Sequence, residues 1–358
     1  MSYTLALGPQ HPAFGGPQQL VLQLTGELVA DVEYRSGADP GLHSGRLARF
    51  ELERALHAAG QIDERSGHAH TMAFCQAVES LCDLALPPRA AYLRVAVAEA
   101  ERISSHLSAL TALFTVIAMQ RVTRQLGDLQ RAAADLLAQL SDAAGAIDLC
   151  VPGGLRRDLS DPARSEALLA IKRLSRRLFQ LTEAIIVERA LLSRTVEVGS
   201  LPGEAASQFG ISGPTARASG LRRDLRIDEP YAAYTALAPT LIAQEGGDVY
   251  ARLVTLLLEA IESSKLVARA LEDLPAGEVL GAMPSALIAG RSEGAVESPH
   301  GPLRYQISSD GKRISELQIV APRQLDRLLA RTLLNGAQLD NVAMIVRSID
   351  PCTACAEC

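Results

Sequence analysis

The chain has 358 residues, a net charge of −6 at pH 7 and a pI near 5.7, and 48% of its residues are hydrophobic. This acidic balance argues against a broad electrostatic attraction to nucleic acid. Six cysteines, three of them within the last seven residues, do not resemble the disulfide framework of a small secreted protein. The first residues lack the basic and apolar regions of a signal peptide, so we expect a soluble protein that partner subunits hold at a membrane.

The N-terminal segment, residues 1–45, is predicted to combine loops with a β hairpin. Residues 8–17 are rich in glycine and proline, which predicts a loop. The apolar residues of 20–24 alternate with other residues, turn at Thr25-Gly26-Glu27 and continue at 28–34, as in a hairpin. Glycine, aspartate and proline break the pattern again at 37–45.

Helical periodicity runs from about residue 46 to 275 and predicts a helical core. One long helix should follow Pro87-Pro88 and reach about Met119, and another should begin at Asp161-Pro162. The eighteen residues between Arg102 and Arg121 carry no formal charge. They include several serines, threonines and a histidine, which are costly in hydrocarbon, so we predict a helix inside a protein core.

The C-terminal segment, residues 276–358, is predicted to hold a second hairpin and a cysteine tail. Residues 304–307 and 317–320 flank the turn at 309–312, while 275–302 lacks regular periodicity. The predicted fold is mainly α (α+β), a helical bundle with small peripheral β hairpins near both ends. We expect one domain over residues 1–358.

The last nine residues, 350–358, carry the strongest chemical signal. Cys352 and Cys355 form a Cys-x-x-Cys pair, a spacing that brings two thiols to one metal ion or cluster. The alternative is a frayed terminus with incidental thiols. The other cysteines lie in apolar segments predicted to be helical, where we expect them to pack: Cys75, Cys82 and Cys150.

Several motifs together resemble one superfamily over nearly the whole chain. It comprises the large subunits of energy-converting, membrane-bound nickel–iron hydrogenases and the 49 kDa (D) subunit of respiratory complex I. No single motif is decisive, but their order over more than three hundred residues is specific, and it implies a hydrogenase-large-subunit-like fold. The similar segments are residues 8–12, 70–79, 87–94, 101–107, 213–220, 230–231, 247–252 and 350–355.

The resemblance implies a metal site, but this chain departs from it. Hydrogenases of the family hold a nickel–iron centre on four cysteines in two Cys-x-x-Cys pairs, and the second pair matches Cys352 and Cys355. The first pair is missing, because residues 64–70 read Glu-Arg-Ser-Gly-His-Ala-His. We therefore predict that genuine nickel–iron hydrogenase activity is lost. Two alternatives stay open: the thiols only pack, or a zinc ion binds a tetrahedral set formed by His68, His70, Cys352 and Cys355.

The complex I branch of the family suggests further site residues. It receives a quinone head group beside a tyrosine and a histidine; His43 matches its histidine loop, while the tyrosine has no match. Arg65 and His70 fall at positions beside the partner's iron–sulfur cluster, where a cation raises the reduction potential. His300 stands where relatives place an arginine or lysine over the metal, and it cannot copy a guanidinium. We expect catalytic roles for Arg65, His70 and His300, and a quinone-pocket role for His43.

By resemblance, the chain is the large subunit of a complex I-like or energy-converting-hydrogenase-like oxidoreductase. It would lie on the cytoplasmic side of the membrane. The implied partners are an iron–sulfur small subunit (complex I B-like), a C-subunit-like protein, a ferredoxin-like iron–sulfur subunit and a membrane subunit (H-like). One alternative is an inert scaffold that couples the small subunit to an ion-translocating module. Another is a functional hydrogenase or quinone-reducing subunit.

Two groups of polar residues have structural explanations. Glu101, Arg102 and His106 recur at near-helical spacing, and we favour satisfied helix contacts over proton transfer. A basic run predicts either a solvated loop or a surface for an acidic partner. The run consists of Arg217, Arg222, Arg223 and Arg226.

Overall fold

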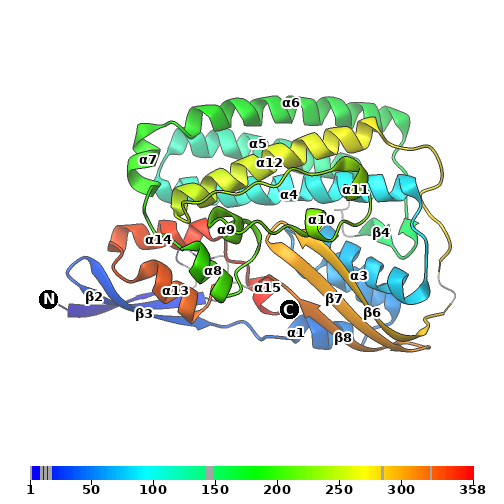
Figure 1. Cartoon of the computed structure of the whole chain (residues 1–358), viewed down its shortest axis with the longest axis horizontal. Coiled ribbons are helices and arrows are strands. Elements are labelled where there is room, and N and C mark those ends of the chain that lie inside the picture. The colour runs from blue at the N-terminus through cyan, green and yellow to red at the C-terminus, as the bar shows by residue number, and fades with distance from the viewer. Residues whose placement is uncertain are drawn as a thin grey trace.

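The computed structural model describes residues 2–8, 11, 14, 18–141, 148–283, 286–322 and 325–358. A bundle of four long helices packed side by side forms its upper half in Figure 1. The predicted helical core is therefore confirmed. The bundle consists of α4 (Pro88–Ile117), α5 (Gln120–Ser141), α6 (Asp161–Ile185) and α12 (Val249–Glu272).

Helix α4 is the central element of the bundle. It begins with Pro88, whose fixed φ suits the first turn of a helix, and it is buried along most of its length. Nearly all of the uncharged run lies in α4, which ends at Ile117 because Ala118 adopts a left-handed conformation (φ 62°). None of the helices in the described segments is long and apolar enough to cross a membrane.

The N-terminal sheet confirms the first predicted hairpin and adds a strand. Strands β1 (Ser2–Leu7), β2 (Gln18–Thr25) and β3 (Leu28–Ser36) pair antiparallel in that order. The sheet is tied to the C-terminal part by the Val29 N–H, which donates to the Ala337 carbonyl at 2.9 Å. The predicted loop at 8–17, with its motif at 8–12, lies outside the described residues except for positions 8, 11 and 14.

The second sheet consists of β6 (Ala289–Ser298), β7 (Gly301–Asp310) and β8 (Ile314–Val320). The β7–β8 hairpin is confirmed, but the expectation of irregular structure over 275–302 is wrong for β6. That strand is rich in glycine, serine and charge, so its sequence lacks an apolar alternation. Helix α3 (Gly67–Cys82) packs so closely on it that a Cβ at Gly294 would lie 2.1 Å from the Ala73 carbonyl oxygen.

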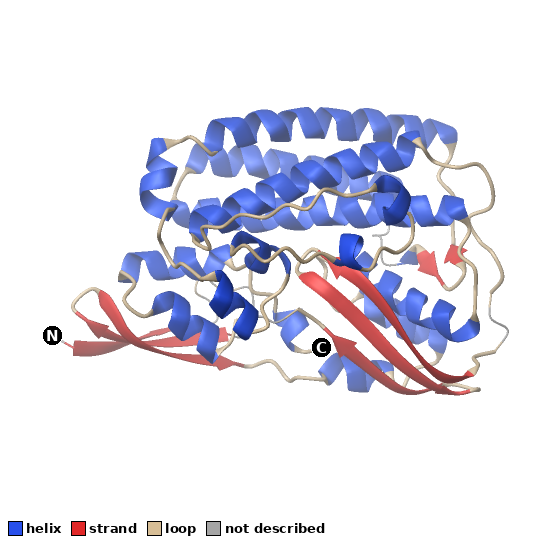
Figure 2. Cartoon of the chain, viewed as in Figure 1, coloured by secondary structure: helices blue, strands red, loops and turns tan. Residues whose placement is uncertain are grey.

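Shorter elements connect these layers, and the two sheets lie at opposite ends below the bundle with the C-terminus between them (Figures 1 and 2). Helix α1 starts inside the segment predicted to be loop, and two helices precede the cysteine tail. The remaining helices up to residue 228 are α1 (Leu42–Leu47), α2 (Leu52–Gly60), α7 (Arg189–Thr195), α8 (Gly203–Gln208), α9 (Gly213–Ala218) and α10 (Leu225–Asp228). The others are β4 (Cys150–Val151), β5 (Gly154–Leu155), α11 (Tyr234–Leu237), α13 (Arg327–Leu334), α14 (Leu339–Ser348) and α15 (Thr353–Ala356).

Candidate functional site

The loop before α3 and the tail after α14 meet through an ion pair between Arg65 and Asp350. Arg65 Nη1 donates to both carboxylate oxygens of Asp350, at 2.7 and 2.8 Å. Burial alone would lower the pKa of Arg65, but the Asp350 carboxylate raises it above its ordinary value. Segments 285 residues apart in the sequence thus form one site, as the resemblance implied.

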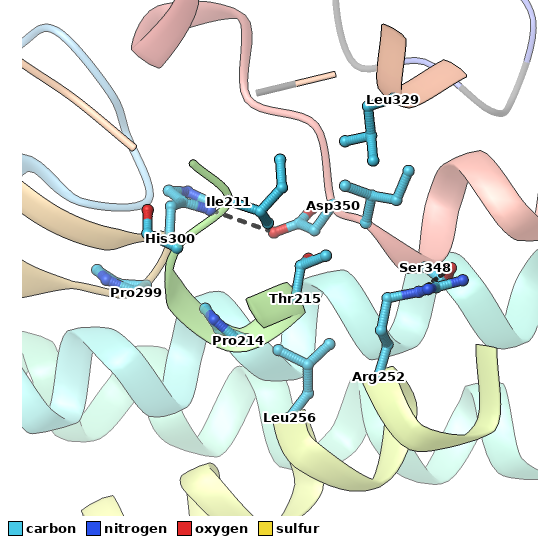
Figure 3. A pocket seen from close by; sticks show the side chains of 12 residues that line it. Ile211, Pro214, Thr215, Arg252, Leu256, Pro299, His300, Leu329, Ser348 and Asp350 are labelled. Carbon is cyan, nitrogen blue, oxygen red and sulfur yellow. Dashed lines mark hydrogen bonds and ion pairs between the residues drawn. The ribbon is translucent and has the colours of Figure 1, made fainter. Parts of the chain in front are cut away.

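The turn between β6 and β7 carries His300 into this site. Its Nε2 lies 3.4 Å from Asp63 Oδ2, and its Nδ1 lies 3.5 Å from Asp350 Oδ2 (Figure 3). Burial and the Arg65 charge oppose protonation of His300, but the contact with Asp63 and the nearby Cys352 and Asp350 outweigh them and raise its pKa. The surrounding groups therefore favour an imidazolium between two carboxylates.

Two neighbours fix the position of the His300 turn. Arg102 Nη1 donates to the Ser298 carbonyl oxygen at 2.8 Å. Gly213, at the start of α9, has φ +67°, and a Cβ there would lie 2.1 Å from the His300 carbonyl oxygen. The turn is therefore clamped between α4 and α9 and cannot swing freely.

Asp63 connects His300 to the first thiol of the tail. Its carboxylate accepts hydrogen bonds from Ser66 Oγ at 2.6 Å and from the Arg65 N–H at 3.1 Å. Cys352 Sγ lies 3.7 Å from Asp63 Oδ2. Burial would raise the pKa of Asp63, but the bonds from His300 and Ser66 and the Arg65 charge hold it below its ordinary value.

The two thiols of the Cys-x-x-Cys pair have different environments. The Cys355 N–H donates to Cys352 Sγ at 3.4 Å. Hydrogen bonding from Cys355 lowers the pKa of Cys352 to about 7 against the burial that opposes it, whereas the pKa of Cys355 is raised by its bond to Cys352 and by burial. Cys352 is therefore the thiol that ionises near neutral pH.

His70 forms a pair with Tyr305, which sequence reasoning missed. His70 Nδ1 and the Tyr305 hydroxyl oxygen lie 2.8 Å apart, and both side chains are buried. Burial lowers the pKa of His70 to about 4, so its imidazole is neutral at pH 7. The sequence did hold a signal for a buried Tyr305, because side chains alternate along β7 and Tyr305 falls on the buried face.

His43 lies in α1 against the C-terminal segment. Its backbone N–H donates to the Glu357 carbonyl at 3.2 Å, and its Nε2 lies 3.4 Å from a Glu357 carboxylate oxygen. The hydroxyl of Ser44, the next residue, donates to the Cys358 carbonyl at 2.9 Å. Helix α1 therefore holds the tail in place, and burial lowers the pKa of His43.

The predicted zinc set is wrong. His68 Nε2 lies 3.1 Å from the Arg94 carbonyl oxygen, and its Nδ1 lies 3.8 Å from Cys150 Sγ, so His68 serves a different part of the core. Residues two apart on a helix point to different sides, and His70 turns to Tyr305 instead. Cys150 itself lies in β4 and not in a helix. Within the described ranges, one group of three or more ligand atoms is close enough to hold a metal: Asp63, His300 and Cys352.

The site does not fit a nickel–iron centre on four thiolates. Besides Cys355, the donors near Cys352 are the Asp63 carboxylate and the His300 imidazole, and the Arg65–Asp350 pair lies beside them. Asp63 and Asp350, like Tyr305, are site residues that sequence reasoning missed. Asp350 stands in the family-like motif at 350–355, but an aspartate before a proline offers no ligand signal of its own.

Arg217 and Arg226 belong to the core, so both predictions for the basic run are wrong for them. Arg217 Nε donates to Glu259 at 2.6 Å and its Nη1 to Glu297 at 2.7 Å. Arg226 donates to Glu99 and Asp224. The other two arginines of the run, Arg222 and Arg223, are exposed.

The satisfied contacts expected for α4 are confirmed. Glu101 accepts the backbone N–H groups of His68 and Ala69 at 2.7 and 3.0 Å. His106 Nε2 lies 2.9 Å from Glu259 Oε2. The contacts of Glu101 and Arg102 anchor the start of α3 and the His300 turn on the central helix, and that of His106 joins the helix to α12.

A small cavity borders the site on the side of α9, α12 and α14 (Figure 3). Its volume is about 30 Å³, enough for a water molecule or two. His300 and Asp350 lie at one end of it, and Arg252 lies at the other, with its Nε bonded to Ser348 Oγ at 2.8 Å.

Comparisons with known proteins agree with this architecture. The family model of the respiratory-chain NADH dehydrogenase 49 kDa subunit matches residues 131–293. The carbon monoxide-induced hydrogenase of Rhodospirillum rubrum is 27% identical, with 99% of each chain covered. A D-type subunit of the NADH-quinone oxidoreductase of Sinorhizobium medicae is 31% identical, over 98% of this chain and 94% of that protein.

A solved structure supports the fold independently. The matching chain comes from a membrane-bound sulfane sulfur reductase, described as an archaeal respiratory membrane complex. The two chains match with a TM-score of 0.91 and 22% sequence identity, and the match covers 100% of this chain and 98% of that one. At this identity the match shows the fold alone. Together with the near full-length relatives at 30–31% identity, it leads to one assignment. The chain belongs to the family of the respiratory-chain NADH dehydrogenase 49 kDa subunit, which includes the D-type subunits of NADH-quinone oxidoreductases.

Proposed function

We propose that the chain is the large subunit of a membrane-associated oxidoreductase complex and that it does not cleave hydrogen. One observation carries the second part: the thiol of Cys352 faces the Asp63 carboxylate and the His300 imidazole where a hydrogenase needs further thiolates. The membership of the family supports the first part, because relatives of nearly the same length are named as oxidoreductase subunits.

The proposed partners follow from the same relationship. An iron–sulfur small subunit would place its cluster near Arg65 and His70, and a C-subunit-like protein, a ferredoxin-like subunit and a membrane subunit would complete the complex. Its place would be the cytoplasmic face of the membrane. Arg65 keeps its charge at every relevant pH and would offset the charge of Asp350 beside a neighbouring cluster.

A scaffold without chemistry of its own is the second candidate. The cavity beside His300 and Asp350 measures about 30 Å³, whereas pockets for small molecules usually measure about 300–1,000 Å³. A quinone ring therefore needs room that a partner subunit helps to shape, with His43 and the pair His70–Tyr305 nearby. If the complex forms no quinone pocket here, the chain serves only to link the iron–sulfur subunit to the membrane subunit.

The test is purification of the intact complex from membranes through a tag on this chain. We expect an iron–sulfur subunit and a membrane subunit to co-purify, with iron and sulfide present, nickel below one tenth per chain and no hydrogen uptake with a viologen dye. Stoichiometric nickel with hydrogen oxidation would overturn the proposal. Recovery of the chain alone, free of membranes and iron–sulfur proteins, would overturn it as well.

Variants in the assembled complex separate the enzyme from the scaffold. If the site does chemistry, His300→Gln and Cys352→Ser should each lower electron transfer to a quinone at least 10-fold while the subunits still co-purify. His57→Gln is the control, because His57 is half exposed and lies in α2. Full activity in both site variants would establish the scaffold and exclude chemistry at this site.

A further inference from the structure

Asp63, His300 and Cys352 come from three distant segments and present three different donor atoms to one point. One carboxylate oxygen, one imidazole nitrogen and one sulfur all lie within 4.8 Å of one another. We propose that these three residues bind a single divalent cation, with Zn²⁺ as the best match, where the resemblance to hydrogenases implied a nickel–iron centre. The proposal concerns metal binding by the chain itself, so it does not depend on the oxidoreductase role.

The spacing of the donor atoms fits a tetrahedral ion. Zinc lies about 2.0–2.1 Å from nitrogen and oxygen ligands and about 2.3 Å from sulfur, so tetrahedral angles put N and O about 3.4 Å apart and S and O about 3.6 Å apart. The observed distances are 3.4 Å from His300 Nε2 to Asp63 Oδ2 and 3.7 Å from Cys352 Sγ to the same oxygen. These two distances match a tetrahedral ion, and the donor atoms of His300 and Cys352 lie within 4.8 Å of each other.

The groups around the ligands already orient them. A metal-bound histidine usually donates its other ring N–H to a carboxylate, and His300 Nδ1 lies 3.5 Å from Asp350 Oδ2. Arg65 fixes Asp350 by two bonds, and Ser66 fixes Asp63. His300 Nε2, on the opposite side of the ring, lies 3.4 Å from Asp63 Oδ2 and 3.5 Å from Arg65 Nη2, so the guanidinium has to turn away from this nitrogen when a cation binds (Figure 3 shows the Asp350 side).

The local charge suits a divalent ion. With Cys352 as thiolate and His300 neutral, three anions, Asp63, Asp350 and Cys352, surround the single guanidinium of Arg65. Two negative charges are then left for the ion to neutralise. The mixture of one sulfur, one nitrogen and one oxygen donor is typical of zinc, whereas a nickel–iron centre relies on thiolates.

Three protein ligands leave the fourth tetrahedral position open, as in catalytic zinc sites. Cys355 does not complete the set: within the described residues, its sulfur is not among the atoms that lie within 4.8 Å of one another. The open position would accept a water molecule, a thiol or another small anionic donor. The site is thus of the kind that exchanges a ligand.

The test is metal titration of the purified full-length chain after removal of metals with a chelator. We expect one Zn²⁺ per chain, and Co²⁺ in its place should give the absorption of a tetrahedral site with one thiolate. Cys352→Ser, His300→Gln and Asp63→Asn should each weaken binding at least about 100-fold. Asp350→Asn, which removes an orienting group only, should weaken it about 10- to 100-fold.

Matched thiol variants decide between this site and a site on the Cys-x-x-Cys pair. Cys355→Ser and Cys358→Ser should change Zn²⁺ affinity less than threefold. A wild-type chain that takes up no stoichiometric metal would overturn the proposal, as would a Co²⁺ spectrum with two thiolates. If Cys352→Ser fails to fold, the wild-type Co²⁺ spectrum still decides. Nickel and hydrogen uptake of the complex test the proposed function separately.

Discussion

Two buried clusters of charge lie close together in this protein and are built differently. The first, the arginine network, joins α4, α9, α10, α12 and β6, and its carboxylates are paired with guanidinium groups that stay charged at any relevant pH. Its members are Glu99, Arg102, Arg217, Asp224, Arg226, Glu259 and Glu297. The second is the site of Asp63, Arg65, His300, Asp350 and Cys352, where an imidazole and a thiol take part.

This difference indicates that the arginine network stabilises the fold, whereas the second cluster can bind or transfer protons and ligands. In the arginine network each carboxylate lies against a guanidinium that stays charged, and burial lowers the pKa of His106, the imidazole that contacts Glu259. In the site the charge depends on the protonation of His300 and Cys352, and it can reach two negative charges. The network also carries the site, because Arg102 holds the turn that presents His300.

Removing a guanidinium from the arginine network should have the largest effect. Arg217→Met leaves Glu259 and Glu297 buried without their main cation, and we expect a loss of about 3–5 kcal/mol in the free energy of unfolding. Urea denaturation measures it. Arg222→Met is the matched control from the same run, exposed and expected to cost less than about 0.5 kcal/mol. Equal losses in the two variants would show that the network is not structural.

The pH dependence of stability should reveal the neutral His70. Burial lowers the pKa of His70 from 6.5 to about 4, so between these values the unfolded chain binds a proton that the folded chain does not. The free energy of unfolding therefore falls as the pH drops through this window, by up to about 3 kcal/mol. His70→Gln keeps a polar partner for Tyr305 and should lose this slope.

The measurement for His70 is a series of denaturation curves between pH 7 and pH 4. His57→Gln serves as the control, because it makes the same substitution at a half-exposed position. Parallel curves for the wild type and His70→Gln would contradict the account.

Two glycine variants should separate, with a smaller change in the free energy of unfolding, the cost of backbone strain from the cost of the close contact at the His300 turn. Gly213 and Gly210 have nearly the same φ, +67° and +66°, but only a Cβ at Gly213 would meet the His300 carbonyl, at 2.1 Å. Both alanine variants carry the left-handed strain of about 1–2 kcal/mol. Gly213→Ala should cost about 1–2 kcal/mol more in thermal or urea unfolding. Equal costs would mean that the turn is free to move.

The sequence predicted the long helices and the two hairpins because their signals are local. Pro88 and Asp161-Pro162 mark helix starts, and the apolar alternation marks β2 and β3. Strand β6 was not predicted because its sequence depends on its contact with α3. Gly294, for example, leaves room for the backbone of that helix. A pattern that depends on a partner element has no local signal.

The candidate site was predicted in part. The structure brings Arg65, His300 and Cys352 together, with His70 and His43 nearby, but their roles stay predictions. The roles of Asp63 and Asp350 depend on distances between segments far apart in the chain, and nothing in the sequence fixes those distances. For the same reason, the burial of Arg217 and Arg226 contradicts an interpretation based on charge alone.

X-ray absorption at the zinc edge of the intact, membrane-purified complex tests the central claim most directly. The account predicts one zinc per chain with a single sulfur at about 2.3 Å and two or three nitrogen or oxygen atoms at about 2.0–2.1 Å. A metal bound by two or more sulfurs, or nickel in its place, would contradict it.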